Sequence, residues 1–217
     1  MQTPVTANFK KNILTKIPEG YYPLMEKFYT IQGEGYHTGK PAFFIRLAGC
    51  DVGCVWCDVK DSWEASASNL IAVNDLLKDV AESKTPNVVI TGGEPAAYNL
   101  TTLTNALSAK GYKVWLETSG AYPLYGNFDW ICVSPKKFKP PMDSVMQKAS
   151  ELKVVVFNES DFEWAEENAS KVSDTAKLFL QPEYSRLDRV MPGIIDYVKR
   201  NPQWSISLQT HKYLNIP

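Results

Sequence analysis

Short apolar runs alternate with amphipathic segments along the chain. Each run is nearly continuous in apolar residues, which is typical of parallel strands that are covered on both faces. Alternation of such strands with helices indicates a parallel sheet. The runs predict strands over residues 42–48, 86–91, 112–118, 128–134, 152–157, 177–182 and 204–209.

Helical periodicity lies between several of these runs. The segment 134–151 is rich in proline and lysine, and we predict that it is mainly loop because proline supports neither helix nor sheet hydrogen bonds. The chain has 217 residues, fewer than the roughly 250 of a complete eight-unit α/β barrel. We therefore predict an α/β fold with mainly parallel strands in an incomplete TIM-type barrel. Helices are expected over residues 70–83, with Leu70 as the first apolar position, 99–109, 159–170 and 188–200.

Composition and charge restrict the classes of function. We expect an N-terminal extension over residues 1–25 and a single core domain over residues 26–217. The 23 basic and 24 acidic residues nearly cancel, which argues against a surface built for nucleic acid or an anionic membrane. No apolar stretch approaches the length of a membrane span, and the N-terminus lacks the apolar core of a secretory signal.

Three of the four cysteines fall close together, immediately after the first predicted strand. Cys50, Cys54 and Cys57 have the spacing Cys-x3-Cys-x2-Cys, and nearby glycines allow the loop to wrap around one centre. Three thiolates leave one coordination position open, which favours an iron–sulfur cluster. The alternative is a Cys3His zinc site, closed by His37 or His211.

The cysteines also indicate where the protein works. Clustered thiols need a reducing compartment, so we expect a cytoplasmic protein. Cys132 lies in the apolar run WICVS and is predicted to be a buried apolar side chain rather than a ligand.

Polar or Gly/Pro motifs follow several of the predicted strands. They are Thr91–Pro95 (TGGEP), Glu117–Gly120 (ETSG), Ser134–Lys136 (SPK) and Gln181–Tyr184 (QPEY). The carboxyl ends of parallel strands form the catalytic face of an α/β barrel. Together these motifs outline a site on that face, beside the cysteine loop.

The cysteine spacing, with an aromatic residue before the last Cys, resembles the signature of the radical S-adenosylmethionine (SAM) superfamily. The resemblance implies a [4Fe–4S] cluster on Cys50, Cys54 and Cys57, whose open iron binds SAM. One electron then cleaves SAM to methionine and a 5′-deoxyadenosyl radical. TGGEP resembles the superfamily's GGE element, which contacts the amino group of SAM.

Within that superfamily, the segments FYTIQGEG (28–35) and QTHKYLNIP (209–217), together with Arg46, resemble the 7-carboxy-7-deazaguanine synthases of the queuosine (7-deazapurine) pathway. The resemblance implies a modified, shortened barrel. The implied substrate is 6-carboxy-5,6,7,8-tetrahydropterin, whose ring contracts with loss of ammonia after hydrogen abstraction from C6. It further implies that SAM is regenerated, that Mg2+ supports the reaction, that a flavodoxin- or ferredoxin-type protein donates the electron, and that the protein is a homodimer.

The resemblance assigns roles by position. Glu34 and His211 are expected to be catalytic. Substrate-binding residues are expected to be Ile31, Gln32, Gly33, Arg46 on the substrate carboxylate, Thr91, and Pro217 through a free carboxylate. SAM-binding residues are expected to be Trp56, Cys57, Asp58, Gly93, Glu94, Ser134, Pro135, Lys136, Gln181, Pro182, Glu183 and Tyr184.

One position departs from the family pattern. The family has Thr or Ser two residues after the last cluster cysteine, where its hydroxyl binds Mg2+, and here that position is Val59. Valine offers no oxygen, and Mg2+ requires oxygen ligands. Either the substrate, water, Asp58 or Asp61 holds the ion, or its role is weakened. We hypothesise a reduced dependence on Mg2+.

Three other functions compete with this interpretation. A small activase that makes a glycyl radical on a partner protein shares the cluster and the GGE element, but gives no reason for Arg46 or the C-terminal motif. A non-enzymatic zinc module would use the three cysteines and one histidine. Nucleic-acid binding could use Trp56, Trp63 and Trp115 for base stacking, but the neutral charge disfavours it.

Overall fold

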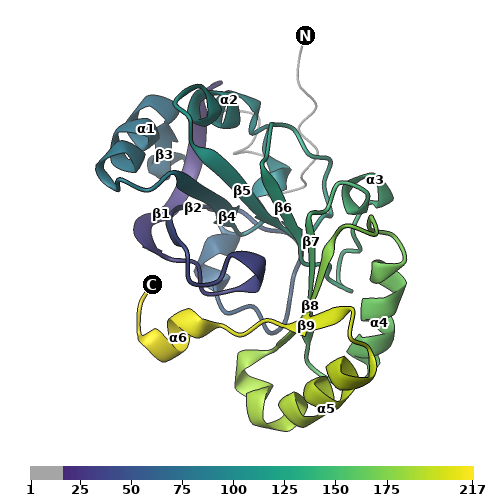
Figure 1. Cartoon of the computed structure of the whole chain (residues 1–217). Helices are drawn as coiled ribbons and strands as arrows, with labels where there is room; N and C mark the ends of the chain where they lie inside the picture. The colour runs from purple at the N-terminus through teal and green to yellow at the C-terminus, as the bar shows by residue number, and fades with distance from the viewer. Residues whose placement is uncertain (1–16) are drawn as a thin grey trace.

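The near-continuous apolar runs form the parallel part of one nine-stranded sheet. A computed structural model describes residues 17–217 of the chain (Figure 1). The strands run in the order β3-β1-β2-β4-β5-β6-β7-β8-β9, and neighbours from β2 to β9 are parallel. The sheet does not close, so the predicted incomplete barrel is confirmed. The parallel strands are β2 (Pro41–Leu47), β4 (Asn87–Gly92), β5 (Lys113–Thr118), β6 (Trp130–Val133), β7 (Glu151–Val156), β8 (Lys177–Pro182) and β9 (Trp204–Ile206).

Two antiparallel strands extend the sheet beyond β2, and neither was predicted. The longer, β1 (Tyr21–Ile31), pairs with β2 and places Glu26 opposite Arg46. Its residues are mostly exposed or half-buried, so it lacks the apolar run by which the other strands were recognised. The shorter, β3 (Leu70–Ala72), occupies the expected start of the first helix. Leu70 pairs with Pro23 in the sheet, and the helix begins three residues later.

The expected extension, residues 1–25, lies mostly outside the described residues. Its final part enters the sheet, because Tyr21 begins β1 and pairs with Ala72 of β3. Pro18 also accepts a hydrogen bond from the backbone of Tyr21. The described part of this segment is therefore attached to the fold.

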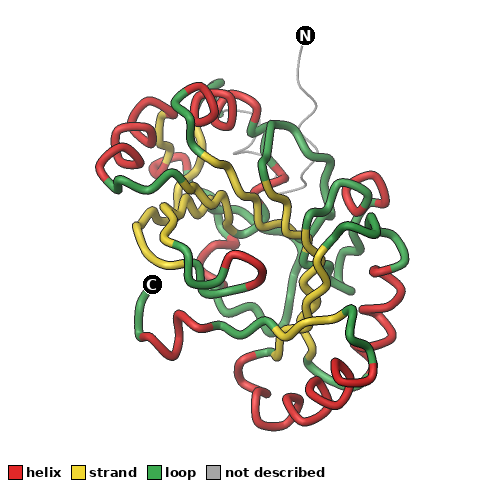
Figure 2. The backbone as a smooth tube through the Cα atoms, viewed as in Figure 1, coloured by secondary structure: helices red, strands yellow, loops and turns green. Residues whose placement is uncertain are grey.

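The longer helices lie along the outside of the sheet (Figure 2). The four predicted helices are present, each within a few residues of its expected bounds: α1 (Val73–Glu82), α2 (Thr101–Ala109), α4 (Ser160–Ala169) and α5 (Leu187–Arg200). Two further helices, α3 (Asp143–Met146) and α6 (Thr210–Leu214), were not predicted. They are too short to show a helical period in the sequence. Among the described residues, no helix is both long and apolar enough to cross a membrane.

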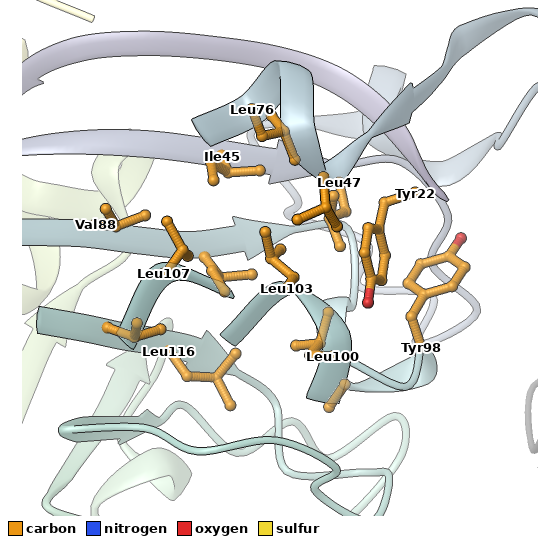
Figure 3. Packing of buried hydrophobic residues seen from close by; sticks show 14 of the residues in the cluster. Tyr22, Ile45, Leu47, Leu76, Val88, Tyr98, Leu100, Leu103, Leu107 and Leu116 are labelled. Atoms are coloured by element: carbon orange, nitrogen blue, oxygen red, sulfur yellow. The ribbon is translucent and has the colours of Figure 1, made fainter. Parts of the chain in front are cut away.

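The main core lies between the outer face of the sheet and α1 and α2. Leu76 of α1 and Leu103 of α2 pack over Ile45, Leu47 and Leu116 of the strands (Figure 3). A second apolar cluster joins the other half of the sheet to α3, α4 and α5. Burial of these aliphatic side chains is the main source of the fold's stability.

An aromatic layer fills the inner face near the amino ends of the strands. The His37 ring stacks on Trp115 with centroids 3.8 Å apart, and Tyr36 stacks on Trp130 at 4.7 Å. Burial lowers the pKa of His37 to about 4, and neither ring nitrogen has a hydrogen-bond partner among the described residues. His37 is therefore a neutral packing residue in this layer.

Candidate active site

A cavity of about 770 Å³ lies at the carboxyl ends of the strands, where the motifs were expected to meet. It is lined by the three clustered cysteines and by nearly all the residues to which the sequence assigned a role. Pro135 is the exception: it is buried and does not line the cavity. The assigned lining residues are Ile31, Gln32, Gly33, Glu34, Arg46, Cys50, Cys54, Trp56, Cys57, Asp58, Thr91, Gly93, Glu94, Ser134, Lys136, Gln181, Pro182, Glu183, Tyr184, His211 and Pro217.

The glycine pair of TGGEP packs directly against the start of the cysteine loop. A Cβ on Gly93 would lie 2.3 Å from the Gly49 carbonyl oxygen, and a Cβ on Gly92 would lie 2.4 Å from that of Leu47. The amides of Gly93 and Glu94 donate to the carbonyls of Leu47 (3.1 Å) and Gly49 (2.8 Å). Glycine is required here because two backbones approach each other, and this approach holds the two motifs together.

The cysteine loop has the donor set of an iron–sulfur cluster. Cys50, Cys54 and Cys57 face one cavity, and burial raises the pKa of Cys50 to about 11 and also raises that of Cys54. Within residues 17–217, no three His, Cys, Asp or Glu side chains are grouped closely enough to hold a single metal ion. A cubane cluster offers a separate iron to each thiolate, so its three ligands do not have to converge on one point. These residues therefore fit a cluster better than a zinc ion.

His37 and the fourth cysteine agree with this assignment. His37 lies in the aromatic layer and does not line the cavity that holds the cysteines. Cys132 is buried on β6 and is also absent from the cavity wall, as predicted for an apolar side chain.

Glu94 is buried, and both of its carboxylate oxygens are occupied. Oε1 accepts from the Ala96 amide (3.0 Å) and the Thr118 hydroxyl (2.6 Å). Oε2 accepts from the Ser119 amide (2.8 Å) and the Ser119 hydroxyl. Glu94 thus joins TGGEP to ETSG and fixes the wall between β4 and β5.

A buried lysine lies between two carboxylates on the inner face of the sheet. Lys153 of β7 is 3% exposed, and its Nζ lies 2.6 Å from Glu34 Oε2 and 3.0 Å from Glu117 Oε2. Burial alone would raise the pKa of Glu34, but the Lys153 ammonium outweighs it and lowers that pKa to about 2. Burial would lower the pKa of Lys153, but the surrounding anionic groups raise it well above its usual range. Both groups are therefore ionised at neutral pH.

Sequence reasoning missed the centre of this network. Glu117 belongs to the ETSG motif but received no role, and Lys153 was treated as part of the apolar run LKVVVF. The signal was available, because a charged residue inside an apolar strand is seldom buried without a partner. Lys153 is such a residue.

The C-terminal segment covers one side of the cavity and contacts three motifs. The Thr210 amide and hydroxyl donate to the Gly33 carbonyl at 2.9 and 3.1 Å, which places α6 beside the loop that follows β1 (Figure 1). Gln209 donates to Glu34 Oε1 (2.8 Å), and the Lys212 ammonium lies over the Tyr184 ring at 4.1 Å. This segment therefore completes the wall of the cavity.

His211 fits closely against the first motif. A Cβ on Gly33 would lie 2.2 Å from His211 Nδ1, so Gly33 is needed for this contact. Burial lowers the pKa of His211 and outweighs the opposing effect of the nearby Glu34 carboxylate. The imidazole is therefore neutral at physiological pH.

Arg46 faces the cavity with most of its hydrogen-bonding capacity unused. Its Nε lies 2.6 Å from Glu26 Oε1 on β1, and this is its only side-chain partner among the described residues. The terminal nitrogens can still bind a carboxylate in bidentate fashion. On the other side of the cavity, Lys136 donates to the Ser134 carbonyl and hydroxyl, both at 2.6 Å.

Oxygen ligands near position 59 are few. Val59 lines the cavity, as does Asp58, whereas Asp61 is exposed and does not. Asp58 Oδ2 accepts from Gln209 (3.3 Å) and Lys212 (3.4 Å). The buried Ser62 also lines the cavity, but its hydroxyl donates to the Val59 carbonyl at 2.6 Å.

The chain is similar to several known proteins. A sequence-family model described as "4Fe-4S single cluster domain" matches residues 31–121. The chain is 54% identical to the 7-carboxy-7-deazaguanine synthase of Flavobacterium psychrophilum, over 90% of this chain and 92% of that one. Identity to the synthase of the same name from Synechocystis is 45%, over 90% and 93% of the two chains. A crystal structure of QueE from Escherichia coli superimposes with a TM-score of 0.77 at 33% identity, covering 87% of this chain and 93% of that one.

Proposed function

The chain belongs to the 7-carboxy-7-deazaguanine synthase family of radical SAM enzymes, and from this premise we infer how its residues perform the reaction. The enzyme is a lyase that contracts the ring of 6-carboxy-5,6,7,8-tetrahydropterin to 7-carboxy-7-deazaguanine, with loss of ammonia. The observation that carries the assignment is the meeting of the cysteine loop, TGGEP and the charged groups of the inner face in one cavity.

The cysteine loop and the strand-end motifs form the cofactor side of the cavity. A [4Fe–4S] cluster on Cys50, Cys54 and Cys57 would supply the electron that cleaves SAM and so generates the radical. We assign SAM binding to Trp56–Asp58, Gly93, Glu94, Ser134, Lys136 and Gln181–Tyr184. Because the oxygens of Glu94 are occupied, its main task is to hold Thr118 and Ser119 in the wall. Pro135 supports its neighbours from behind the wall.

The substrate side lies between β1, β2 and α6. Arg46 offers a planar pair of N–H donors to the substrate carboxylate. Ile31, Gln32, Gly33, Thr91 and Pro217 form the pocket for the pterin ring. The polar donors of the amino-pyrimidine edge need acceptors, and carboxylates of the inner face are close to this pocket.

Glu34 and His211 are the proposed catalytic groups. Glu34 is ionised because the adjacent Lys153 ammonium lowers its pKa, so its carboxylate can accept a hydrogen bond from the substrate. His211 is neutral and can both donate and accept. Loss of ammonia requires proton movement at the leaving nitrogen, and these two groups flank the same cavity.

A direct assay tests this function. Anaerobically reconstituted protein, SAM, sodium dithionite and the carboxytetrahydropterin should yield the deazaguanine acid. Cys54→Ala should abolish product and the broad visible absorption of the cluster, whereas Cys132→Ala, the matched control, should retain both. A colourless protein with one zinc per chain, or product formed by Cys54→Ala, would contradict the assignment. An activase would leave the pterin unchanged.

Mg2+ is expected to support turnover only weakly. Val59 supplies no oxygen, and Asp58, the adjacent residue in the chain, is a carboxylate on the cavity wall. Turnover should fall less than about twofold when EDTA replaces Mg2+, whereas Val59→Thr should make turnover depend on the ion. A strict Mg2+ requirement in the unmodified protein would refute this proposal.

The oligomeric state, the cellular location and the electron donor are proposed from the family. We assign the core domain to residues 26–217, with the extension contributing its last residues, from Tyr21, to the sheet. The protein is proposed to be a cytoplasmic homodimer reduced by a flavodoxin- or ferredoxin-type protein. Sedimentation velocity would measure the dimer, and a monomer at micromolar concentration would exclude it.

A further inference from the structure

One extra residue in β1 decides on which face of the sheet Glu26 lies. Tyr22 is part of the outer apolar core and Leu24 packs against it, so strict alternation along the strand would place Glu26 on that outer face as well. Between the pairs that Leu24 and Glu26 form, β1 advances by two residues while β2 advances by one, so Met25 is the extra residue. This β-bulge reverses the alternation and directs Glu26 into the cavity.

The residues that follow agree with this change of side. Lys27 forms an ion pair with Asp79 of α1, the helix that covers the outer face. Phe28, the next residue, lines the cavity together with Glu26. Bulges occur often beside active sites, where they redirect a side chain. The contacts of Glu26 inside the cavity therefore indicate what the bulge is for.

Inside the cavity, Glu26 binds one edge of the Arg46 guanidinium. Glu26 Oε1 accepts a hydrogen bond from Arg46 Nε at 2.6 Å. A carboxylate can bind a guanidinium either through Nε and one terminal nitrogen or through both terminal nitrogens. Because Glu26 occupies Nε, the end that carries the two terminal nitrogens remains for the substrate carboxylate.

Arg46 lies in a row with two other residues of the cavity wall. It pairs with Glu26 of β1 on one side and with Thr91 of β4 on the other, and all three line the cavity. Arginine has a long, flexible side chain, and ordering such a side chain on binding costs a factor of about two to ten in affinity. A carboxylate that already holds Nε removes part of this cost before the substrate binds.

We propose that Glu26 is a positioning residue, which fixes the Arg46 guanidinium so that its two terminal nitrogens face the substrate carboxylate. The proposal rests on the proposed function, in which Arg46 binds that carboxylate. Glu26 also opposes binding, because its own charge repels a second carboxylate. Its side chain is 45% exposed, so solvent screens this repulsion, whereas the hydrogen bond to Nε fixes the orientation directly. Orientation therefore outweighs repulsion.

The two effects predict opposite changes in Glu26→Ala. Loss of orientation should raise the KM for the carboxytetrahydropterin about tenfold, while kcat stays within about threefold. Loss of repulsion alone would lower the KM. Glu26→Gln removes the charge but retains an oxygen that can accept from Nε, so its KM should stay within about threefold of that of the unmodified protein.

Two stable pterins, used as inhibitors, separate positioning from a general change of the pocket. 6-Carboxypterin carries the carboxylate that Arg46 would bind, and pterin lacks it. In Glu26→Ala the inhibition constant of carboxypterin should rise about tenfold, whereas that of pterin should not change. An equal rise for both inhibitors would show a disturbed pocket and would overturn the proposal.

A double variant tests whether Glu26 acts through Arg46. Arg46→Ala should raise the KM more than Glu26→Ala does, and adding Glu26→Ala to Arg46→Ala should raise it no further. The matched control is Asp79→Ala, which removes the acidic partner of Lys27 on the outer face and should leave the KM unchanged. Urea unfolding of each variant corrects the rates for any loss of folded protein.

The outcomes separate this proposal from the proposed function. An unchanged or lower KM in Glu26→Ala would overturn the positioning role, as would an equal loss in Glu26→Gln or a full effect of Glu26→Ala in the Arg46→Ala background. A KM that Arg46→Ala leaves unchanged would overturn it too, because Arg46 would then not bind the carboxylate. Absence of product from the unmodified protein would instead refute the proposed function.

Discussion

The two faces of strand β7 are equally buried but chemically opposite. Leu152 and Val154 point outward into the second apolar cluster, and Glu151 and Lys153 point inward. All four side chains are at most 3% exposed. Alternating residues of this strand therefore lie in an apolar environment on one side of the sheet and beside charged groups on the other. Burial on the outer face stabilises the fold, whereas burial on the inner face shifts the pKa values of charged groups near the cavity.

The energetics of the two faces differ in kind. Each outer aliphatic side chain contributes about 1.5–3 kcal/mol through removal from water. A buried ion pair gains little overall, because the cost of desolvation offsets the attraction of the charges. Removing one partner is nevertheless costly, since the other charge is then left buried and unpaired. The buried charged groups of the inner face are therefore stable only when all of them are present.

Lys153→Met should have the largest effect. It leaves Glu34 and Glu117 buried without their counter-charge, so the free energy of unfolding should fall by about 3–5 kcal/mol. Urea unfolding would measure this loss. Adding Glu34→Gln and Glu117→Gln should recover most of the stability but none of the turnover. If the single variant is as stable as the unmodified protein, the inner charges are not coupled as described.

Leu152→Ala tests the neighbouring position on the outer face. The cavity left by the side chain should lower the free energy of unfolding by about 2–5 kcal/mol. Turnover per folded molecule should stay within twofold, because this side chain is remote from the cavity at the strand ends. A large fall in kcat with unchanged stability would show that the two faces are not independent.

Glu151→Gln should have a smaller, pH-dependent effect. Burial, opposed in part by Lys153, raises the pKa of Glu151 to about 7. The folded protein therefore retains a proton that the unfolded chain loses near the ordinary value of 4.5. This contribution to stability is complete below that value and is lost as the pH rises through 7.

The measurement is urea unfolding of both proteins at several values between pH 5 and 8. The unmodified protein should lose stability across this range, by at most about 1.4 kcal/mol per pH unit from this group. Glu151→Gln should lose less. If the free energy of unfolding falls equally with pH in both proteins, a residue other than Glu151 is the one that titrates.

The same contrast explains how far the sequence could be interpreted. Strands covered on both faces were predicted from their apolar runs, and the four long helices from their periodicity. Strand β1 was missed because its side chains are mostly exposed or half-buried. The helices α3 and α6 were missed because four or five residues hold barely one helical turn.

Site residues could be predicted where a motif carried them. The cysteines and TGGEP were found from local spacing, but the contact between Gly93 and Gly49 joins residues far apart in the chain. Lys153 has no motif and stands alone among apolar neighbours. Its role depends on Glu34 and Glu117, which only the fold brings within 3.0 Å.

The aromatic layer of Tyr36, His37, Trp115 and Trp130 has a kinetic consequence. None of these residues lines the cavity, and together they fill the inner face below it. Within the described residues, the cavity therefore has no outlet through this aromatic layer, and ligands enter and leave at the carboxyl ends of the strands. Product must depart before the next pterin can bind, so the deazaguanine acid is expected to inhibit competitively against the pterin.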